Sequence, residues 1–306
     1  MSLTSSKRIL ITGASGLIGR LVASALRESG IEAVALGRSA VNAPPFSASF
    51  IWNPATGYFD DKALEGVDAI IHLAGAGIAD KRWTDKRKQE ILESRIASAH
   101  LLATKLKSIP NQVRTIVAAS AIGYYGNSGE QEMNETSQAG NDFLALTCMQ
   151  WEQALNELKQ SNRRLAILRI GIVLDANGGA LPVMARPVKM LAGAPYGNGK
   201  QFVSWIDSHD LVQLFLKAVM DENMSGIYNA VAPAPVSNKQ FVHAIGKTIH
   251  RPVWPIPIPG FIFKIMLGEQ AEMILGGQHV SSEKVIKTGF QFKYPELLQS
   301  LQHHLG

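Results

Sequence analysis

The sequence predicts an α/β chain with a Rossmann-like, doubly wound parallel sheet that carries helices on both faces, followed by a small, mainly helical C-terminal cap. Three observations lead to this fold class. Short apolar runs alternate with amphipathic segments up to Ile170, a glycine-rich turn follows the first run, and Gly and Pro become frequent after Gly171. The 306 residues are 46% hydrophobic and 18% charged, which allows a large core and excludes disordered or collagen-like chains.

The expected elements of the sheet region follow one another in regular alternation. Strands are predicted over 8–12, 31–36, 68–73, 113–119 and 165–170, and helices over 17–29, 85–107 and 143–160. In the first helix, Leu17, Leu21 and Leu26 recur at helical spacing, and Gly30 ends the helix. This alternation predicts a parallel sheet, because each parallel strand needs a crossover segment to reach its neighbour.

The pattern beyond Gly171 predicts a division into two domains. A helix over 207–221 and a strand over 226–230 would complete the sheet domain, while proline-punctuated helical segments follow Ser237. We therefore expect a Rossmann domain over 1–175, completed by about 203–232, and a substrate-covering cap over 176–202 and 233–306.

Composition and charge limit the possible partners. The net charge of +5, from 30 Lys and Arg against 25 Asp and Glu, is mild and favours anionic small molecules over nucleic acid. One cysteine, Cys148, excludes a disulfide framework and suits a reducing cytoplasm. The eight histidines show no metal-ligand spacing, so no metal site is expected.

No targeting or membrane segment is expected. The first seven residues lack an apolar leader, and the most apolar stretch, 253–267, is too short and too rich in proline to span a bilayer. The sequence therefore predicts a cytoplasmic protein without a membrane partner.

The turn over 12–19, Thr-Gly-Ala-Ser-Gly-Leu-Ile-Gly, has the placement that a pyrophosphate needs, between a strand and a helix. Gly13 permits the tight turn, Gly16 lets backbone amides approach the phosphates, and Gly19 allows close helix packing. The helix N-terminus adds partial positive charge. The residues expected to bind a dinucleotide here are Gly13, Ser15, Gly16, Leu17, Ile18 and Gly19.

The end of the second strand predicts the choice of cofactor. An NAD enzyme usually carries Asp or Glu there, which holds the ribose 2′-hydroxyl. This chain has Gly37-Arg38-Ser39 instead. Arg38 can pair with a 2′-phosphate and Ser39 can donate to it, so NADP(H) is the predicted cofactor. The alternative is that Arg38 is a surface arginine in a loop.

Two motifs, His72–Gly75 and Ser120–Gly126, together with the glycine turn, resemble the extended short-chain dehydrogenases/reductases. Further motifs follow one another along the chain: Trp52–Pro54, Arg82–Thr84, Ser94-Arg95, Asp142–Leu144, Trp151-Glu152, Gly178–Ala180, Ser204–Ile206, Asn229–Pro233, Leu275–Gln278 and Gly289–Pro295. In their order and spacing they resemble the YfcH-type epimerase family proteins, and the last two resemble the C-terminal domain of that family. The resemblance covers nearly the whole chain. It implies an NADP(H)-binding domain, a C-terminal domain over the substrate cleft and a largely uncharacterised function.

The resemblance also implies further contacts with the cofactor. Leu73, Ala74 and Gly75 would pass beneath the adenosine and pyrophosphate, and Ile172 would lie by the nicotinamide. Glu90 and Arg95 would face the cofactor as well. Core packing of Leu73 and Ala74, and a solvated Glu90–Arg95 pair, stay open as alternatives.

The usual Tyr and Lys pair of short-chain dehydrogenases is missing. Counted back from Glu152, the tyrosine position falls on Leu144 and the lysine position on Cys148, and neither can exchange the proton that accompanies hydride transfer. Ser120, Tyr124 and Tyr125 are the remaining candidate catalytic residues. The alternatives are a turn-capping hydroxyl for Ser120 and packing against the cap for both tyrosines. Either tyrosine could be a neutral donor; no cation is expected nearby, so a phenolate is not expected at pH 7. Cys148 and His72 are expected to be structural, and Asp207 to cap or begin a helix.

Two functions follow. The first is an NADP(H)-dependent oxidoreductase or epimerase that acts on a small polar substrate. The second is a non-catalytic NADP(H)-binding protein that regulates a partner, which the missing Tyr and Lys pair favours. A role in septation, a label used for some of these relatives, has no physical support in the residues. The sequence predicts neither the substrate nor the oligomeric state.

Overall fold

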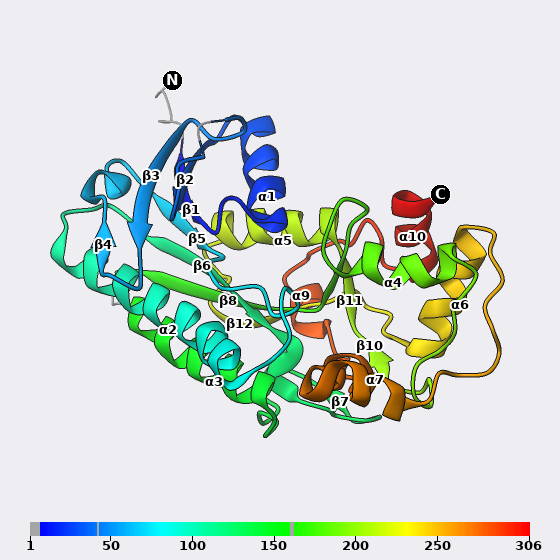
Figure 1. Cartoon of the computed structure of the whole chain (residues 1–306). Helices are drawn as coiled ribbons and strands as arrows, with labels where there is room; N and C mark the ends of the chain where they lie inside the picture. Colours follow the sequence, from blue (N-terminus) through cyan, green and yellow to red (C-terminus); the bar gives the residue numbers. More distant parts are fainter. Residues whose placement is uncertain (1–6, 42, 160–161) are drawn as a thin grey trace.

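The computed structural model describes residues 7–41, 43–159 and 162–306, and its centre is an eight-stranded sheet with the order β12-β8-β6-β5-β1-β2-β3-β4 (Figure 1). Its strands are β1 Arg8–Thr12, β2 Glu32–Gly37, β3 Ala48–Asn53, β4 Tyr58–Phe59, β5 Ala69–His72, β6 Thr115–Ala121, β8 Arg164–Ile170 and β12 Gly226–Ala230. All neighbouring strands pair in parallel except β3 and β4. The predicted doubly wound sheet is confirmed.

Helices cover both faces of this sheet. The helices α1 Leu17–Glu28 and α5 Ser208–Met220 contact each other on one face, and α2 Asp85–Ser108 and α3 Phe143–Leu155 contact each other on the opposite one (Figure 1). The central strands are therefore shielded from water on both sides, which explains their continuous apolar runs; Ile9, Leu10 and Ile11 have no exposed surface.

The edge formed by β3 and β4 has no counterpart among the predicted strands. All residues of β3 except Trp52 are only half-buried. The predicted helix over 143–160 ends earlier, at Leu155, and continues as the 3-10 helix η3 Asn156–Leu158; residue 160 lies outside the described residues.

The C-terminal part is mainly helical, as predicted. It contains α4 Ala180–Lys189, α6 Asn238–Thr248, α7 Gly260–Leu267, η4 Gly268–Ala271, α8 Glu272–Leu275, α9 Glu283–Lys287 and α10 Leu297–Leu305. Three short strand pairs link it to the sheet region: β9 Ile172–Leu174 with β11 Trp205–Asp207, β10 Phe202–Val203 with β13 Val236–Ser237, and β7 Glu132–Met133 with β14 His279–Val280. A second apolar core, which includes Trp205, Phe241 and Leu301, lies here.

Two buried carboxylates near the start of α5 hold the C-terminal segment in place. Asp207 caps α5 through the His209 amide at 2.8 Å, and it also accepts hydrogen bonds from Ser300 at 2.6 Å and His304 at 3.1 Å. Asp210 accepts the amides of residues 293 and 294. Burial alone would raise the pKa of Asp207, but the hydrogen bonds from His304 and Ser300 outweigh burial and hold the pKa below its ordinary value.

No helix among residues 7–41, 43–159 and 162–306 is long and apolar enough to cross a membrane.

Asp207→Ala tests whether this carboxylate anchors the C-terminal helix. The substitution leaves the buried Ser300 hydroxyl and the His304 ring without their acceptor, so we expect it to lower the free energy of unfolding by about 2–4 kcal/mol, measured by urea titration. Asp61→Ala, which removes only an exposed partner of Lys105, should cost less than about 1 kcal/mol. Equal losses in the two variants would contradict the anchoring role.

Candidate functional site

The turn between β1 and α1 requires glycine at two positions. Gly13 has φ +67°, and a Cβ atom there would lie 2.7 Å from the carbonyl oxygen of Leu73. A Cβ atom on Gly19 would lie 2.6 Å from the carbonyl oxygen of Gly13. The Gly16 amide closes the turn by donating to Gly13 at 3.0 Å. The backbone is thus packed as closely as the sequence predicts for a pyrophosphate-binding turn.

The N-terminus of α1 offers unpaired backbone amides. Its N-cap is Gly16, no side chain caps it, and its first turn carries no acidic residue. The amides of Leu17, Ile18 and Gly19 precede the first intrahelical donor, because Arg20 is the residue whose amide reaches Gly16. Ser15 precedes the helix and is exposed. This arrangement fits the phosphates of a dinucleotide, which such amides and the helix dipole attract.

Arg38 and Ser39 lie at the carboxyl end of β2, the strand beside β1. Both are exposed, and Arg38 forms no ion pair with the part of the chain that the structure describes. The chain bends sharply at Gly37, where a Cβ atom would lie 3.0 Å from the Ser39 carbonyl oxygen. An unpaired guanidinium here can meet an anionic group on the ribose of a nucleotide held by the glycine turn.

A buried hydrogen-bonded group fixes the loop that follows β5. The Thr12 hydroxyl accepts the amides of Leu73 and Ala74 at 3.0 and 3.2 Å and lies 2.9 Å from Nδ1 of His72. On the other side of the ring, Nε2 lies 3.4 Å from the Ser98 hydroxyl. Burial lowers the pKa of His72 to about 4. His72 is therefore a neutral, structural histidine that positions Leu73 and Ala74 under the glycine turn.

Arg95 approaches the same loop from α2. A Cβ atom on Gly75 would lie 3.2 Å from the Arg95 guanidinium carbon, and that guanidinium lies 5.0 Å from the centre of the Trp151 ring. Burial and the charge of Arg87 lower the pKa of Arg95. Glu90 pairs with Arg87 at 3.1 Å, so no Glu90–Arg95 pair forms. Arg95 thus lies beside the predicted cofactor path without a carboxylate.

Ile172 is the last of the residues that the resemblance assigns to the cofactor. It begins β9, directly after β8 ends, and its amide donates to the Ser204 carbonyl at 2.9 Å. Its side chain is half-buried.

Ser120 and Tyr125 belong to a buried polar network around Arg169. The Ser120 hydroxyl donates to Glu152 at 2.7 Å, and Glu152 accepts two hydrogen bonds from Arg169, each at 2.8 Å. Arg169 also donates to the Tyr125 hydroxyl at 3.0 Å, which in turn donates to Asn229 at 2.7 Å. All five side chains are buried. Each hydroxyl is therefore already committed to a partner within the protein.

Arg169 also contacts Tyr124, whose ring centre lies 3.4 Å from the guanidinium carbon. The expectation that no cation lies near these tyrosines is therefore wrong. Burial raises the pKa of Tyr125, although Arg169 opposes this effect, so the phenol stays neutral. Tyr124 is half-buried, and no hydrogen bond of its hydroxyl occurs within the described ranges.

Arg169 and Asn229 were not among the predicted site residues, and Glu152 served only to locate the positions of the missing Tyr and Lys pair. The available signal was the arginine within the otherwise apolar strand over 165–170, because a charge in a buried strand needs a partner. The spacing of residues along the sequence does not show which carboxylate pairs with this arginine.

Leu144 and Cys148 occupy the place expected for the missing Tyr and Lys pair. They face the 3-10 helix η2 Ile122–Tyr125, because a Cβ atom on Gly123 would lie 3.4 Å from Leu144 and 3.8 Å from the Cys148 sulfur. Burial raises the pKa of the Cys148 thiol to about 12. The thiol is therefore protonated near neutral pH, as expected of a small buried side chain.

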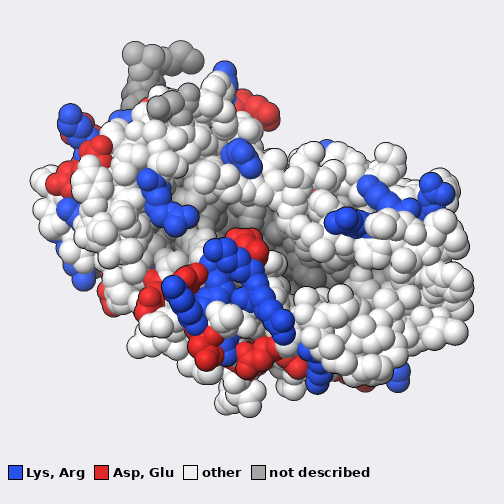
Figure 2. All heavy atoms as spheres, in the orientation of Figure 1, with Lys and Arg blue, Asp and Glu red and all other residues white. Residues whose placement is uncertain are grey.

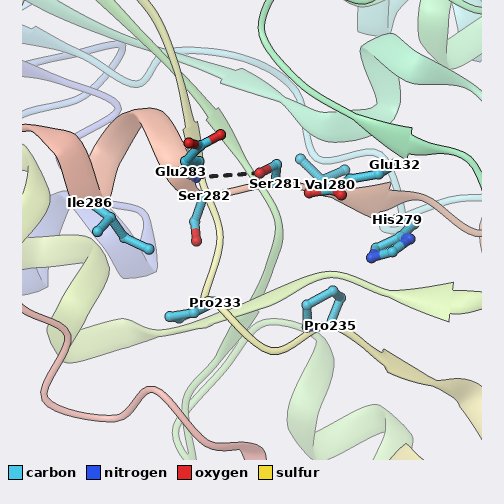
Figure 3. A pocket seen from close by; sticks show the side chains of 9 residues that line it. All are labelled: Glu132, Pro233, Pro235, His279, Val280, Ser281, Ser282, Glu283 and Ile286. Carbon is cyan, nitrogen blue, oxygen red and sulfur yellow. Dashed lines mark hydrogen bonds between the residues drawn. The ribbon is translucent and has the colours of Figure 1, made fainter.

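One cavity adjoins the network from the cap side. It has a volume of about 170 Å³ and is lined by Glu132, Pro233, Pro235, His279, Val280, Ser281, Ser282, Glu283 and Ile286 (Figure 3). The Ser281 carbonyl accepts a hydrogen bond from Asn229, but none of the predicted site residues lines the cavity. Among the described ranges, no group of three or more His, Cys, Asp or Glu side chains could hold a metal ion.

The lowered pKa of His72 predicts a pH-dependent stability. The unfolded chain binds a proton below about pH 6.5, whereas the folded chain binds it only near pH 4. The free energy of unfolding should therefore fall as the pH drops from 6.5 to 4, with roughly 3 kcal/mol from this residue. His72→Asn should flatten this dependence in urea titrations between pH 7 and 4.5. His250→Asn, which removes an exposed histidine, should keep it; an unchanged slope in His72→Asn would contradict the assignment.

Known proteins match this chain over nearly its full length. The model of the NAD dependent epimerase/dehydratase family matches residues 9–230, and the domain of unknown function DUF1731 matches residues 258–304. The epimerase family protein YfhF of Bacillus subtilis is 35% identical over 94% of this chain and 95% of its own length. The mouse epimerase family protein SDR39U1 is 32% identical over 96% of this chain and 98% of its own.

A solved structure has the same overall fold. The crystal structure of human epimerase family protein SDR39U1 with NADPH superposes with a TM-score of 0.87 at 30% identity, and the match covers 97% of this chain and 98% of the human one. These matches confirm the resemblance seen in the sequence motifs. The chain belongs to the NAD dependent epimerase/dehydratase family of the short-chain dehydrogenase/reductase superfamily, as one of the epimerase family proteins that carry a C-terminal DUF1731 domain.

Proposed function

We propose that this protein binds NADP(H) in preference to NAD(H). The observation that carries the proposal is the close-packed glycine turn at an uncapped helix N-terminus, with the unpaired Arg38 at the end of the neighbouring strand. The NADPH bound to the human relative supports it. The proposed binding residues are Gly13, Ser15, Gly16, Leu17, Ile18, Gly19, Arg38, Ser39, Leu73, Ala74, Gly75, Glu90, Arg95 and Ile172.

Different residues would contact different parts of the cofactor. The amides of Leu17 and Ile18 would hold the pyrophosphate, and Arg38 with Ser39 would hold the 2′-phosphate. Arg95 adds a guanidinium with no carboxylate beside Gly75. When bound, the nicotinamide supplies hydride transfer, and the protein supplies position and a charge environment.

We further propose that the protein is an oxidoreductase or epimerase for a small polar substrate, with the cap over 176–202 and 233–306 covering the cleft beside the domain over 1–175 and 203–232. Tyr124 is half-buried and stacked on Arg169, so its hydroxyl is the candidate donor to the substrate. Ser120 and Tyr125, whose hydroxyls are bound within the buried network, would act by positioning this loop. A cytoplasmic location fits the single reduced cysteine.

A non-catalytic NADP(H)-binding protein is the second candidate function. It is favoured by one observation: Leu144 and the protonated Cys148 face η2 where a Tyr and Lys pair would be expected. In that case the bound cofactor would order the protein for a partner.

Arg38→Ala tests the cofactor preference. Loss of a charge-assisted, bidentate contact of about 1.5–3 kcal/mol should weaken NADPH binding roughly 10- to 150-fold and leave NADH binding within about threefold. Titration of NADPH fluorescence or calorimetry measures both constants. Arg27→Ala, at the other end of α1, should change neither. A native protein that binds both nucleotides equally well would refute the assignment of Arg38.

NADPH oxidation with a panel of aldehydes and ketones separates an oxidoreductase from a non-catalytic NADP(H)-binding protein. The enzyme predicts saturable turnover, which Tyr124→Phe should lower roughly 100-fold by removing one proton donor, and which Ser120→Ala should also lower. NADPH binding should be intact in both variants. Tight NADPH binding without turnover of any substrate would instead favour the non-catalytic function.

A further inference from the structure

The C-terminal part exposes an unusual number of large apolar side chains. Nine of the 14 exposed large hydrophobic side chains lie within 183–191 and 254–266, and several are mostly in water, for example Ile256 at 76%, Ile265 at 74% and Phe261 at 63%. The nine are Val183, Met190, Leu191, Trp254, Ile256, Phe261, Ile262, Ile265 and Met266. A patch of this kind on a folded chain usually marks a binding surface.

These side chains come from three segments that lie against one another. The end of α4 meets the segment over 253–259, since the Trp254 indole donates to the Leu191 carbonyl at 2.8 Å and the Trp254 amide donates to Gly193. The same segment continues along 195–197, because the Ile258 amide donates to Pro195. From there α7 follows, anchored by the ring contact of Phe263 with Tyr196 at 5.0 Å. The segments over 190–197 and 253–267 thus lie against one another, and we call the exposed apolar side chains that they carry the α7 face.

The helix α7 has no residue that is buried. Its sequence over 260–267, Gly-Phe-Ile-Phe-Lys-Ile-Met-Leu, is apolar except for Lys264. Phe263 and Leu267 are half-buried, whereas Phe261, Ile262, Ile265 and Met266 are exposed. Most of the apolar surface of this helix therefore lies in water.

The segments that form the α7 face carry charges of one sign. Residues 176–202 and 233–268 contain no Asp or Glu, and all seven of their Lys and Arg residues are exposed: Arg186, Lys189, Lys200, Lys239, Lys247, Arg251 and Lys264. Figure 2 shows, on the right-hand part of the molecule, Lys and Arg side chains beside a broad uncharged field. The first carboxylates, Glu269 and Glu272, follow α7 and pair with Lys88 and Lys264.

We propose that the α7 face binds the surface of a bilayer rich in anionic phospholipid. The apolar side chains of α7 and Trp254 would enter the headgroup region, and the surrounding cations would contact lipid phosphates. A peripheral contact of this kind needs no membrane-spanning segment, so the stretch over 253–267 is long enough for it. The proposal differs from the sequence-based expectation that the protein has no membrane partner.

Other occupants fit the face less well. A second copy of this chain would bring the same seven cations against one another, because a twofold interface joins identical surfaces. A nucleic acid would pair with the cations but would leave Phe261, Ile265 and Met266 in water. An anionic bilayer satisfies both the charge and the apolar side chains.

Co-sedimentation of the full chain with vesicles tests the proposal. In about 0.1 M salt, we expect binding to phosphatidylglycerol-containing vesicles, at least tenfold weaker binding to pure phosphatidylcholine, and loss of binding as salt rises. The variant Phe261→Ser, Ile265→Ser, Met266→Ser should bind at least tenfold more weakly. Each of Arg186→Gln, Lys189→Gln and Arg251→Gln should cost roughly fivefold.

Matched control variants test whether vesicle binding depends on the α7 face in particular. Tyr58→Ser, Met149→Ser, Met220→Ser removes the same number of exposed apolar side chains elsewhere and should bind vesicles like the native chain. NADPH binding should be unchanged in every variant, which checks folding and keeps this test separate from the proposed cofactor site. Three results would overturn the proposal: equal vesicle binding by both triple variants, dimers of the native chain without vesicle binding, or binding to duplex DNA without vesicle binding.

Discussion

The close approach of two backbones, at Gly13 and Leu73, is the constraint on which the candidate cofactor site depends. The strands β1 and β5 are neighbours, so both chain segments leave the sheet through the same small space. A Cβ atom on Gly13 would collide with the Leu73 carbonyl at 2.7 Å. Thr12 and His72 fix this crossing, because the Thr12 hydroxyl binds the Leu73 amide and the His72 ring together. The turn can therefore hold α1 with its amides open.

The fold could be predicted from the sequence because its determinants are local. Each determinant can be recognised within about 20 residues of sequence: the apolar runs of strand length, the glycine turn and the alternation with helices. The predicted helix over 85–107, for example, matches α2 to within one residue. The edge over 48–59 escaped prediction, since its side chains are half-buried and its apolar pattern is weak. The close-packed glycine turn could likewise be predicted, because its packing depends on spacing along one strand–turn–helix unit.

The polar network could not be predicted, because it joins residues that are far apart in the sequence. Ser120, Glu152 and Arg169 come from three elements, and only the fold brings them within 2.7–2.8 Å. Burial of a charged pair costs hydration free energy, and this cost is offset only when every hydrogen-bonding group of the pair has a partner. Hydrogen bonds and the charge of Glu152 outweigh burial and hold the pKa of Arg169 above its ordinary value. The guanidinium therefore stays charged, and its hydrogen bonds hold the segment over 120–125 beside Leu144.

The two parts of the chain differ in charge as well as in structure. The segments 176–202 and 233–306 hold ten of the 30 Lys and Arg residues but only four of the 25 Asp and Glu residues, so the net charge of +5 comes entirely from them. The mild net charge of the whole chain does not show this difference between its two parts. The expectation of small anionic partners alone was based on that net charge. The proposed cofactor site needs only a few cations at defined positions, and Arg38 and Arg95 are the ones that we propose. Seven exposed cations on the segments that also carry the α7 face are better suited to an extended anionic surface, whose charges have no fixed positions.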